Sequence, residues 1–193
     1  MKKLSVADLL TLERYARERS AFRAQVLAHK ADRQLAVGPN LRWCFEDRLT
    51  IQYQVQEMLR TERIFEAEGI VEELESYNPL IPDGSNWKVT LLIEYPDAEE
   101  RRLALGRLKG VEDTCWIRVQ GHEQVFARAD EDLERENDEK TSAVHFLRFE
   151  LEPTMVTALR AGAELVVGVE HAAYRHELQV PPAARSALIA DLD

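Results

Sequence analysis

Cysteine is scarce in this sequence, and a long hydrophobic run is missing. The two cysteines, Cys44 and Cys115, lie far apart and match no CxxC spacing. This count argues against a disulfide scaffold and is typical of a cytosolic protein with incidental thiols. No apolar stretch approaches the ~18–20 residues that cross a bilayer. The positive start, Met1-Lys2-Lys3, is not followed by the apolar core of a signal peptide. We therefore predict a cytoplasmic protein without a membrane segment.

Positive charge is also in short supply. The chain carries 25 lysines and arginines against 35 acidic residues, a net charge of −10. This balance argues against general nucleic-acid binding, because phosphate contacts need a basic surface. The first 50 residues nevertheless hold ten basic and six acidic residues, a net of +4, whereas the remainder holds 15 and 29, a net of −14. Packing of the basic start beside acidic elements would explain this asymmetry, and so would an anion site on an arginine-rich helix face. That face carries Arg14, Arg17, Arg23 and Lys30.

The motifs of several common enzyme classes are missing. The sequence has no glycine-rich dinucleotide fingerprint, no phosphate-binding P-loop, no HExxH zinc motif and no GxSxG nucleophile turn. The Glu-x-x-His pattern of helical di-iron bundles is missing as well. Any functional site must therefore be assembled from residues that are distant in the sequence.

The order of periodic segments predicts one α+β domain. Helical spacing dominates residues 1–80, β-forming residues dominate residues 87–180, and residues 182–192 have the pattern of a short C-terminal helix. A chain of 193 residues has the size of a single domain. We expect N-terminal helices followed by a largely antiparallel sheet built from hairpins, in one compact domain that spans residues 1–193.

One carboxylate falls on the apolar face of a predicted helix. Across residues 50–66 apolar side chains recur at helical spacing, and Glu62 falls in the middle of that stripe with Glu66 at its edge. A carboxylate in a core is costly unless it is paired, protonated or bound to a cation. Glu62 is therefore a candidate metal ligand or general base. The alternatives are a buried ion pair with an arginine, or a helix end that tips into solvent.

Histidines supply the other candidate ligands. In the predicted strand 143–151, His145 shares the expected core face with Phe149. His171 and His176 flank the turn of the last predicted hairpin. The candidate ligands for a divalent metal ion are therefore Glu62, Glu66, His145, His171 and His176. The alternative is a satisfied core histidine and two solvated histidines.

Three runs of sequence resemble a bacterial protein family. They are YNPLIPDG at residues 77–84, SAVHFLRFE at residues 142–150 and YRHE at residues 174–177. Over nearly the whole chain the sequence is similar to an uncharacterised bacterial family of about this length, which carries a domain-of-unknown-function label. The resemblance implies no catalytic residue. Members of the family are often encoded near rubrerythrin-like and iron–sulfur redox proteins, which implies a role in redox metabolism or oxidative stress.

Competing functions are compatible with the sequence. One is an accessory or partner-binding protein of a bacterial redox or oxidative-stress system, favoured by the missing catalytic motifs and by the acidic segment 130–139. Another is a small metal-dependent enzyme with a Glu/His site. Small-anion binding by the basic helix face is a third. The sequence determines neither the substrate nor the oligomeric state.

Overall fold

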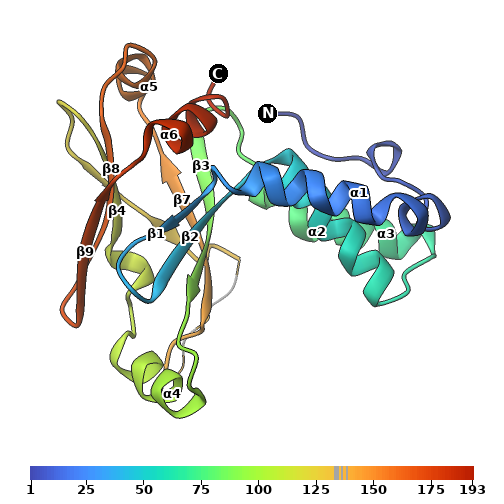
Figure 1. Cartoon of the computed structure of the whole chain (residues 1–193), viewed down its shortest axis with the longest axis horizontal. Helices are drawn as coiled ribbons and strands as arrows, with labels where there is room; N and C mark the ends of the chain where they lie inside the picture. The colour runs from blue at the N-terminus through green and yellow to red at the C-terminus, as the bar shows by residue number, and fades with distance from the viewer. Residues whose placement is uncertain (133–134, 136, 138) are drawn as a thin grey trace.

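Two antiparallel sheets face each other across the main hydrophobic core (Figure 1). The computed structural model describes residues 1–132, 135, 137 and 139–193. The first sheet has the strand order β1-β2-β3-β7-β6, and the second has the order β5-β4-β8-β9. The strands are β1 (Gln34–Ala36), β2 (Leu41–Glu46), β3 (Asn86–Ile93), β4 (Cys115–Val119), β5 (Gln124–Phe126), β6 (Arg128–Ala129), β7 (Val144–Glu150), β8 (Leu165–His171) and β9 (Tyr174–Gln179). Burial alternates along β3 and β7, so each strand turns one face to the core and the other outward.

Large aromatic side chains fill the space between the sheets. Trp43 stacks on Phe149 with the ring centroids 5.3 Å apart, and both side chains are fully buried. On β8 the backbone of Gly168 lies against the indole of Trp116, where an added Cβ would come within 2.3 Å of the ring. The core therefore requires glycine at this position, because a side chain would displace the indole.

Three helices form a layer beside the first sheet, on the side away from the second sheet (Figure 1). They are α1 (Leu12–Lys30), α2 (Arg48–Thr61) and α3 (Ala67–Tyr77), accompanied by the short 3-10 turns η1 (Val6–Asp8) and η2 (Asn78–Leu80). On α2, Ile51, Val55 and Leu59 recur at helical spacing and are all buried. Together with Leu4, Leu74 and Ile81 they form a second, smaller hydrophobic core.

The α+β class and the antiparallel hairpins are confirmed, but the helices are not all N-terminal and the strands form two sheets rather than one. The remaining elements are α4 (Ala98–Arg107), η3 (Glu112–Thr114), α5 (Pro153–Arg160) and α6 (Pro182–Ile189). Local capping explains why helices form between strands. Asp97 accepts hydrogen bonds from the first backbone N–H groups of α4, and proline occupies the start of α5 and α6.

A buried arginine joins the helical layer to the C-terminal helix. Arg33, only 4% exposed, donates to the carboxylate of Asp191 at 2.7 and 2.8 Å and to the carbonyl oxygen of Ala187 at 3.2 Å. Its Nε also lies 3.2 Å from Asp47, the N-cap residue of α2. His29 approaches the same Asp47 carboxylate at 2.5 Å. The network therefore ties α1, α2 and α6 to one point.

The start of the chain is held by an asparagine side chain. Asn78 accepts a hydrogen bond from the backbone N–H of Leu4 at 2.8 Å and donates to the carbonyl oxygen of Leu4 at 2.9 Å. The ammonium group of Lys3 donates to the carbonyl oxygen of Ile81 at 2.6 Å. These bonds satisfy the extended backbone before η1 and direct Leu4 into the second core.

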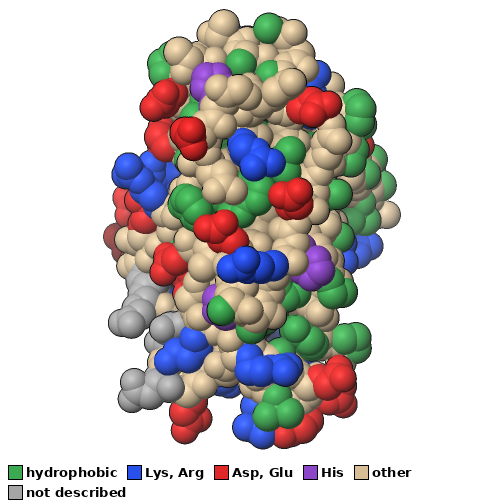
Figure 2. Space-filling view, turned by 90° about the vertical axis from the view of Figure 1, so that its left-hand side faces the viewer, with side chains coloured by type: hydrophobic (Ala, Val, Ile, Leu, Met, Phe, Trp, Pro, Cys, Tyr) green, Lys and Arg blue, Asp and Glu red, His purple; other side chains and the backbone are tan. Residues whose placement is uncertain are grey.

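The outer face of the second sheet carries interspersed acidic and basic side chains (Figure 2). The edge strand β9 exposes Arg175, His176 and Glu177. Charged side chains on an edge strand disfavour pairing with the edge of another sheet. Among the residues that the structure describes, no helix has the length and apolar character needed to cross a bilayer.

Replacing Arg33 should destabilise the fold strongly. An Arg33→Leu variant leaves the carboxylates of Asp47 and Asp191 buried without their cation, which costs about 3–5 kcal/mol when one partner of a buried pair is removed. Arg42→Leu is the matched control, since Arg42 pairs with Glu94 at 2.9 Å on the exposed surface and such pairs contribute about 0–1 kcal/mol. Urea unfolding of both variants measures the difference. Equal losses would contradict the central role of Arg33.

Stability in acid should depend on Glu57. Arg19 donates to both carboxylate oxygens of Glu57 at 2.7 and 2.6 Å, and these bonds lower the pKa of Glu57 from 4.5 to about 2. A carboxylate with a depressed pKa stabilises the fold above its ordinary pKa and loses that contribution as the pH falls toward 2. Glu57→Gln should therefore reduce the unfolding free energy at neutral pH and flatten its decline between pH 4.5 and pH 2. Glu18→Gln, at an exposed pair with Arg14, should change it little.

Candidate functional site

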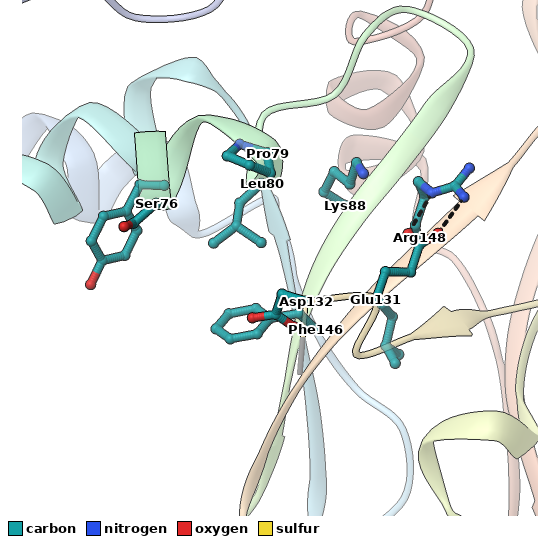
Figure 3. Close-up of a pocket in the computed structure, with 10 residues that line it drawn as sticks. Ser76, Pro79, Leu80, Lys88, Glu131, Asp132, Phe146 and Arg148 are labelled. Carbon is teal, nitrogen blue, oxygen red and sulfur yellow. Dashed lines mark hydrogen bonds and ion pairs between the residues drawn. The ribbon is translucent and has the colours of Figure 1, made fainter. Parts of the chain in front are cut away.

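A cavity of about 350 Å³ opens between the end of α3 and the outer face of the first sheet (Figure 3). Its lining residues are Ser76, Tyr77, Pro79, Leu80, Lys88, Glu131, Asp132, Phe146, Leu147 and Arg148. A neighbouring cavity of about 330 Å³ shares Tyr77, Leu80 and Phe146 and continues along the sheet to Cys44. We call this continuous depression the helix–sheet cleft.

The floor of the cleft places two cations side by side. Lys88 on β3 pairs in register with Arg148 on β7, and both side chains point outward from the sheet. Like charges directly opposite each other in a sheet repel. Arg148 is neutralised locally, because it donates to Glu131 at 2.7 and 2.8 Å and contacts Glu150 at 2.5 Å. Lys88 makes no such contact with a described residue, and only the more distant charges of Glu131 and Asp83 attract its ammonium group.

Lys88 is the distinctive group of the cleft. Its half-buried side chain makes no hydrogen bond or ion pair with any other residue that the structure describes. It lies between Leu80 and Arg148, as Figure 3 shows. Burial is the main cause that lowers the pKa of Lys88, and the positive charge of Arg148 lowers it further. An anion bound at this point would relieve both costs.

The walls of the cleft are mostly apolar. Pro79 and Leu80 come from η2, and the Leu80 side chain points toward Phe146 of β7 (Figure 3). The guanidinium carbon of Arg135 lies over the Phe146 ring, 4.6 Å from the ring centroid. An apolar body with one convergent cation is the usual composition of a pocket for a small organic molecule.

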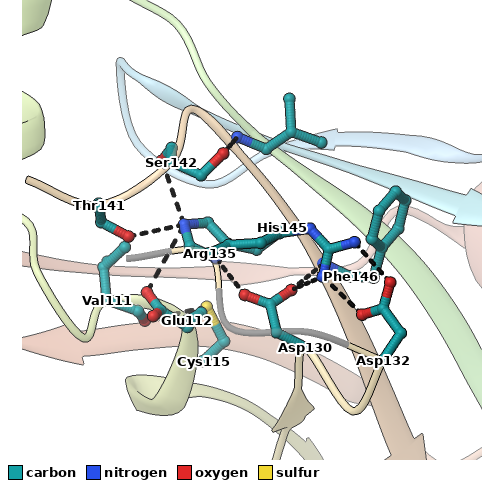
Figure 4. Close-up of polar contacts among 11 residues, drawn as sticks. Val111, Glu112, Cys115, Asp130, Asp132, Arg135, Thr141, Ser142, His145 and Phe146 are labelled. Carbon is teal, nitrogen blue, oxygen red and sulfur yellow. Dashed lines mark hydrogen bonds and ion pairs between the residues drawn. The ribbon is translucent and has the colours of Figure 1, made fainter. Parts of the chain in front are cut away.

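A second polar cluster lies directly behind the cleft, on the core face of β7 (Figure 4). Its centre is the fully buried His145, whose Nδ1 lies 2.6 Å from the carboxylate of Asp130. Its Nε2 lies 2.9 Å from the hydroxyl of Thr141, 3.1 Å from the carbonyl oxygen of Ser142 and 3.7 Å from the carboxylate of Glu112. We call these five residues the buried histidine cluster.

The buried histidine cluster positions one wall of the cleft. Asp130 accepts a hydrogen bond from the backbone N–H of Phe146 at 2.9 Å and an ion pair from Arg135 at 3.2 Å. Asp130 also has a left-handed backbone, with φ of 46°, which reverses the chain after β6. The next two residues, Glu131 and Asp132, consequently turn back to line the cleft.

The two glutamates predicted from the helix pattern do not lie in a core. Glu62 is exposed at the C-cap of α2, and Glu66 is exposed at the N-cap of α3. The apolar pattern continues beyond α2, but the helix ends because Arg63 adopts a left-handed conformation with φ of 57° and the N–H of Ile64 donates to the carbonyl oxygen of Leu59. Neither glutamate makes an ion pair with another described residue.

The three candidate histidines divide into one buried residue and two that lie on the last hairpin. His145 faces the core as predicted. The half-exposed His171 donates to the carbonyl oxygen of Lys109 at 3.0 Å and accepts from the N–H of Ala173, so both of its ring nitrogens are occupied. His176 is exposed and contacts the ring of Tyr174. In the described part of the chain, Glu112, Asp130 and His145 form the one group of three acidic or histidine side chains whose ligand atoms all lie within 4.8 Å of one another.

Sequence reasoning missed Lys88, Glu112 and Asp130. The alternation of β3 places Lys88 outward, between the buried Trp87 and Val89, and this signal was available. Asp130 belongs to the acidic segment 130–139, which in the sequence favours partner binding and gives no sign of a buried site. Residues 133, 134, 136 and 138 of that segment lie outside the described residues.

Arginines on and beside the basic helix face form ion pairs with glutamates of the helical layer. Arg14 pairs with Glu18 at 2.8 Å in the next turn, and the neighbouring Arg19 pairs with Glu57 of α2. Part of the positive charge of the N-terminal region is therefore balanced within the helical layer, in keeping with intramolecular charge complementarity.

Comparison with known proteins identifies the family but not a function. No curated protein matches the chain. The chain is similar to the protein in the crystal structure of a novel protein of unknown function from Burkholderia pseudomallei K96243 at 1.90 Å resolution, with 50% sequence identity, a TM-score of 0.95 and 100% of both chains covered. Residues 3–192 match the family described as "Protein of unknown function (DUF3501)". The chain therefore belongs to the DUF3501 family.

Proposed function

We propose that this protein is an accessory binding protein that holds a small organic anion in the helix–sheet cleft. The observation that carries the proposal is the half-buried ammonium group of Lys88, which faces the cavity without a hydrogen bond or ion pair to any described residue. Burying a charge without a partner is costly. A ligand carboxylate or phosphate would supply that partner.

The shape and composition of the cleft indicate the rest of the ligand. Tyr77, Leu80 and Phe146 form a shared wall between the two neighbouring cavities. Apolar walls of this kind bind a flat or aliphatic body, while a single cation fixes its orientation. A cavity of about 350 Å³ suits a metabolite rather than a peptide. The proposed ligand class is therefore a carboxylate or phosphate attached to an aromatic or apolar body.

The residues that line the cleft favour binding over chemistry. Cys44 lines the second cavity, but burial raises the pKa of its thiol to about 11, so it remains protonated near neutral pH. Glu131 is engaged by Arg148 at 2.7 Å. A base or nucleophile held in these states is poorly prepared for catalysis.

The sequence-based functions have unequal support. A partnership with a redox or oxidative-stress enzyme, and the cytoplasmic location, stay predictions. A metal-dependent enzyme that uses all the predicted ligands has little support, because His145 is buried whereas Glu62, Glu66 and His176 are exposed. Binding at the cleft is compatible with an accessory role, since a bound metabolite could control or accompany a partner.

Ligand binding should depend on the charge of Lys88. Small aromatic carboxylates and phosphate esters, such as benzoate and phenyl phosphate, should raise the melting temperature more than acetate or inorganic phosphate do. Calorimetric titration of the best compound should show affinity reduced by about tenfold to a hundredfold in Lys88→Met, the loss expected for one charge-assisted contact of about 1.5–3 kcal/mol. Lys2→Met, which removes an exposed ammonium, is the matched control. Unchanged affinity in Lys88→Met would refute the proposal.

The same variant should not weaken the fold. Lys88→Met removes no described hydrogen bond or ion pair and relieves the burial of a charge, so its melting temperature at pH 7 should equal or exceed that of the parent protein. A lysine with a lowered pKa costs stability while it is charged, and that cost disappears as the pH rises through the lowered pKa toward 10.5. Any advantage of Lys88→Met should therefore shrink in alkali. Arg148→Met, which breaks two ion pairs, should melt earlier.

A further inference from the structure

We propose that the buried histidine cluster is a binding site for one divalent transition-metal ion, held by His145 Nε2, Glu112, Thr141 and the carbonyl oxygen of Ser142. Asp130 contacts the other ring nitrogen, Nδ1, so it orients the histidine without binding the ion. The proposal is independent of the cleft and of its ligand. It assigns to His145 a set of partners that differs from the glutamates and histidines predicted from the sequence.

The distances around His145 Nε2 fit ligands that share one ion. The hydroxyl of Thr141, the carbonyl oxygen of Ser142 and the carboxylate of Glu112 lie 2.9, 3.1 and 3.7 Å from this nitrogen. If the ion lies about 2.1 Å from Nε2 and from each oxygen, these separations correspond to nitrogen–metal–oxygen angles of about 85–125°. These angles lie in the range of octahedral and tetrahedral coordination, so an ion can be accommodated with small adjustments of the side chains.

Asp130 prepares the histidine for this role. Its carboxylate lies 2.6 Å from Nδ1 and accepts the N–H of that nitrogen. In the neutral ring the lone pair is then on Nε2, the nitrogen that faces the three oxygen groups. A histidine that donates one N–H to a carboxylate and binds a metal through the other nitrogen is a recurrent arrangement in metalloproteins. Asp130 is itself held by the backbone N–H of Phe146 and by Arg135. The ring orientation is therefore fixed before any ion arrives.

Burial and charge favour a cation at this point. His145 is 0% exposed, Thr141 is 2% exposed and Glu112 is 7% exposed. A divalent cation at this point would be attracted by the negative charges of Glu112 and Asp130, which lie within ligand distance of His145. A mixed set of one imidazole and several oxygen ligands suits ions such as Mn²⁺, Fe²⁺ or Zn²⁺ better than Ca²⁺, which prefers oxygen ligands alone.

The alternative occupant of the same position is a proton. Without a metal ion, Nε2 can carry a hydrogen and donate it to the carbonyl oxygen of Ser142, and His145 is then positively charged. The two states differ in a measurable way. The metal-bound ring has one N–H, at Nδ1, whereas the protonated ring has two.

Metal content and affinity give the first test. Full-length protein purified without a histidine tag, stripped with a chelator and reconstituted with Mn²⁺, Fe²⁺ or Zn²⁺ should retain about one ion per chain after desalting, and its melting temperature should rise. Glu112→Gln keeps the size of the side chain but removes its charge, and should weaken binding by about tenfold or more. His176→Gln removes an exposed histidine and should leave binding unchanged.

The protonation of His145 gives a second test that does not depend on the variants. In zinc-loaded protein labelled with ¹⁵N at histidine, long-range ¹H–¹⁵N spectra should show a hydrogen on Nδ1 and none on Nε2. Two ring hydrogens in the presence of excess Zn²⁺, or metal content equal to that of the buffer, would overturn the proposal. If Glu112→Gln does not fold, Thr141→Val provides the affinity comparison, because it retains the shape of the side chain and removes the hydroxyl.

Discussion

The buried guanidinium of Arg33 is the interaction on which the arrangement of the layers depends. It lies at the end of α1, where the chain enters β1, and it engages Asp191 near the C-terminus and Asp47 at the start of α2. Three charged groups so far removed from water are stable only while all of them remain together. The contacts of Arg33 with Asp47 and Asp191 therefore fix the position of the helical layer relative to the two sheets. This placement brings η2 over the first sheet and creates the helix–sheet cleft.

Most of the local structure could be predicted, and most of the site could not. Turn residues and alternation in the sequence indicated the hairpins and placed His145 toward the core. The end of α2 depends on a left-handed Arg63, a conformation that the helical pattern does not reveal. The pairing of Lys88 with Arg148 requires β3 to lie beside β7, across a long stretch of intervening chain. Contacts of this kind arise from topology rather than from local residue patterns.

The cleft and the buried histidine cluster differ in the groups that surround their buried polar side chains. Around His145, carboxylates, a hydroxyl and a carbonyl group surround one imidazole, and both ring nitrogens have hydrogen-bond partners. Around Lys88, apolar side chains line the cavity together with Glu131 and Arg148, and the ammonium group makes no hydrogen bond or ion pair with a residue that the structure describes. The first arrangement holds the segment after β6 in place and can admit a cation. The second is open on the ligand side, which suits an exchangeable molecule.

Strand β7 links these two places through adjacent residues. His145 points into the core and Phe146 points into the cleft, because successive side chains of a strand face opposite ways. A slip of β7 by a single residue against β3 would exchange the two environments, burying a phenyl ring among carboxylates and moving the imidazole to the open face. The buried histidine cluster and the helix–sheet cleft therefore both specify the register of β7 against β3, because neither can form when β7 is shifted by one residue.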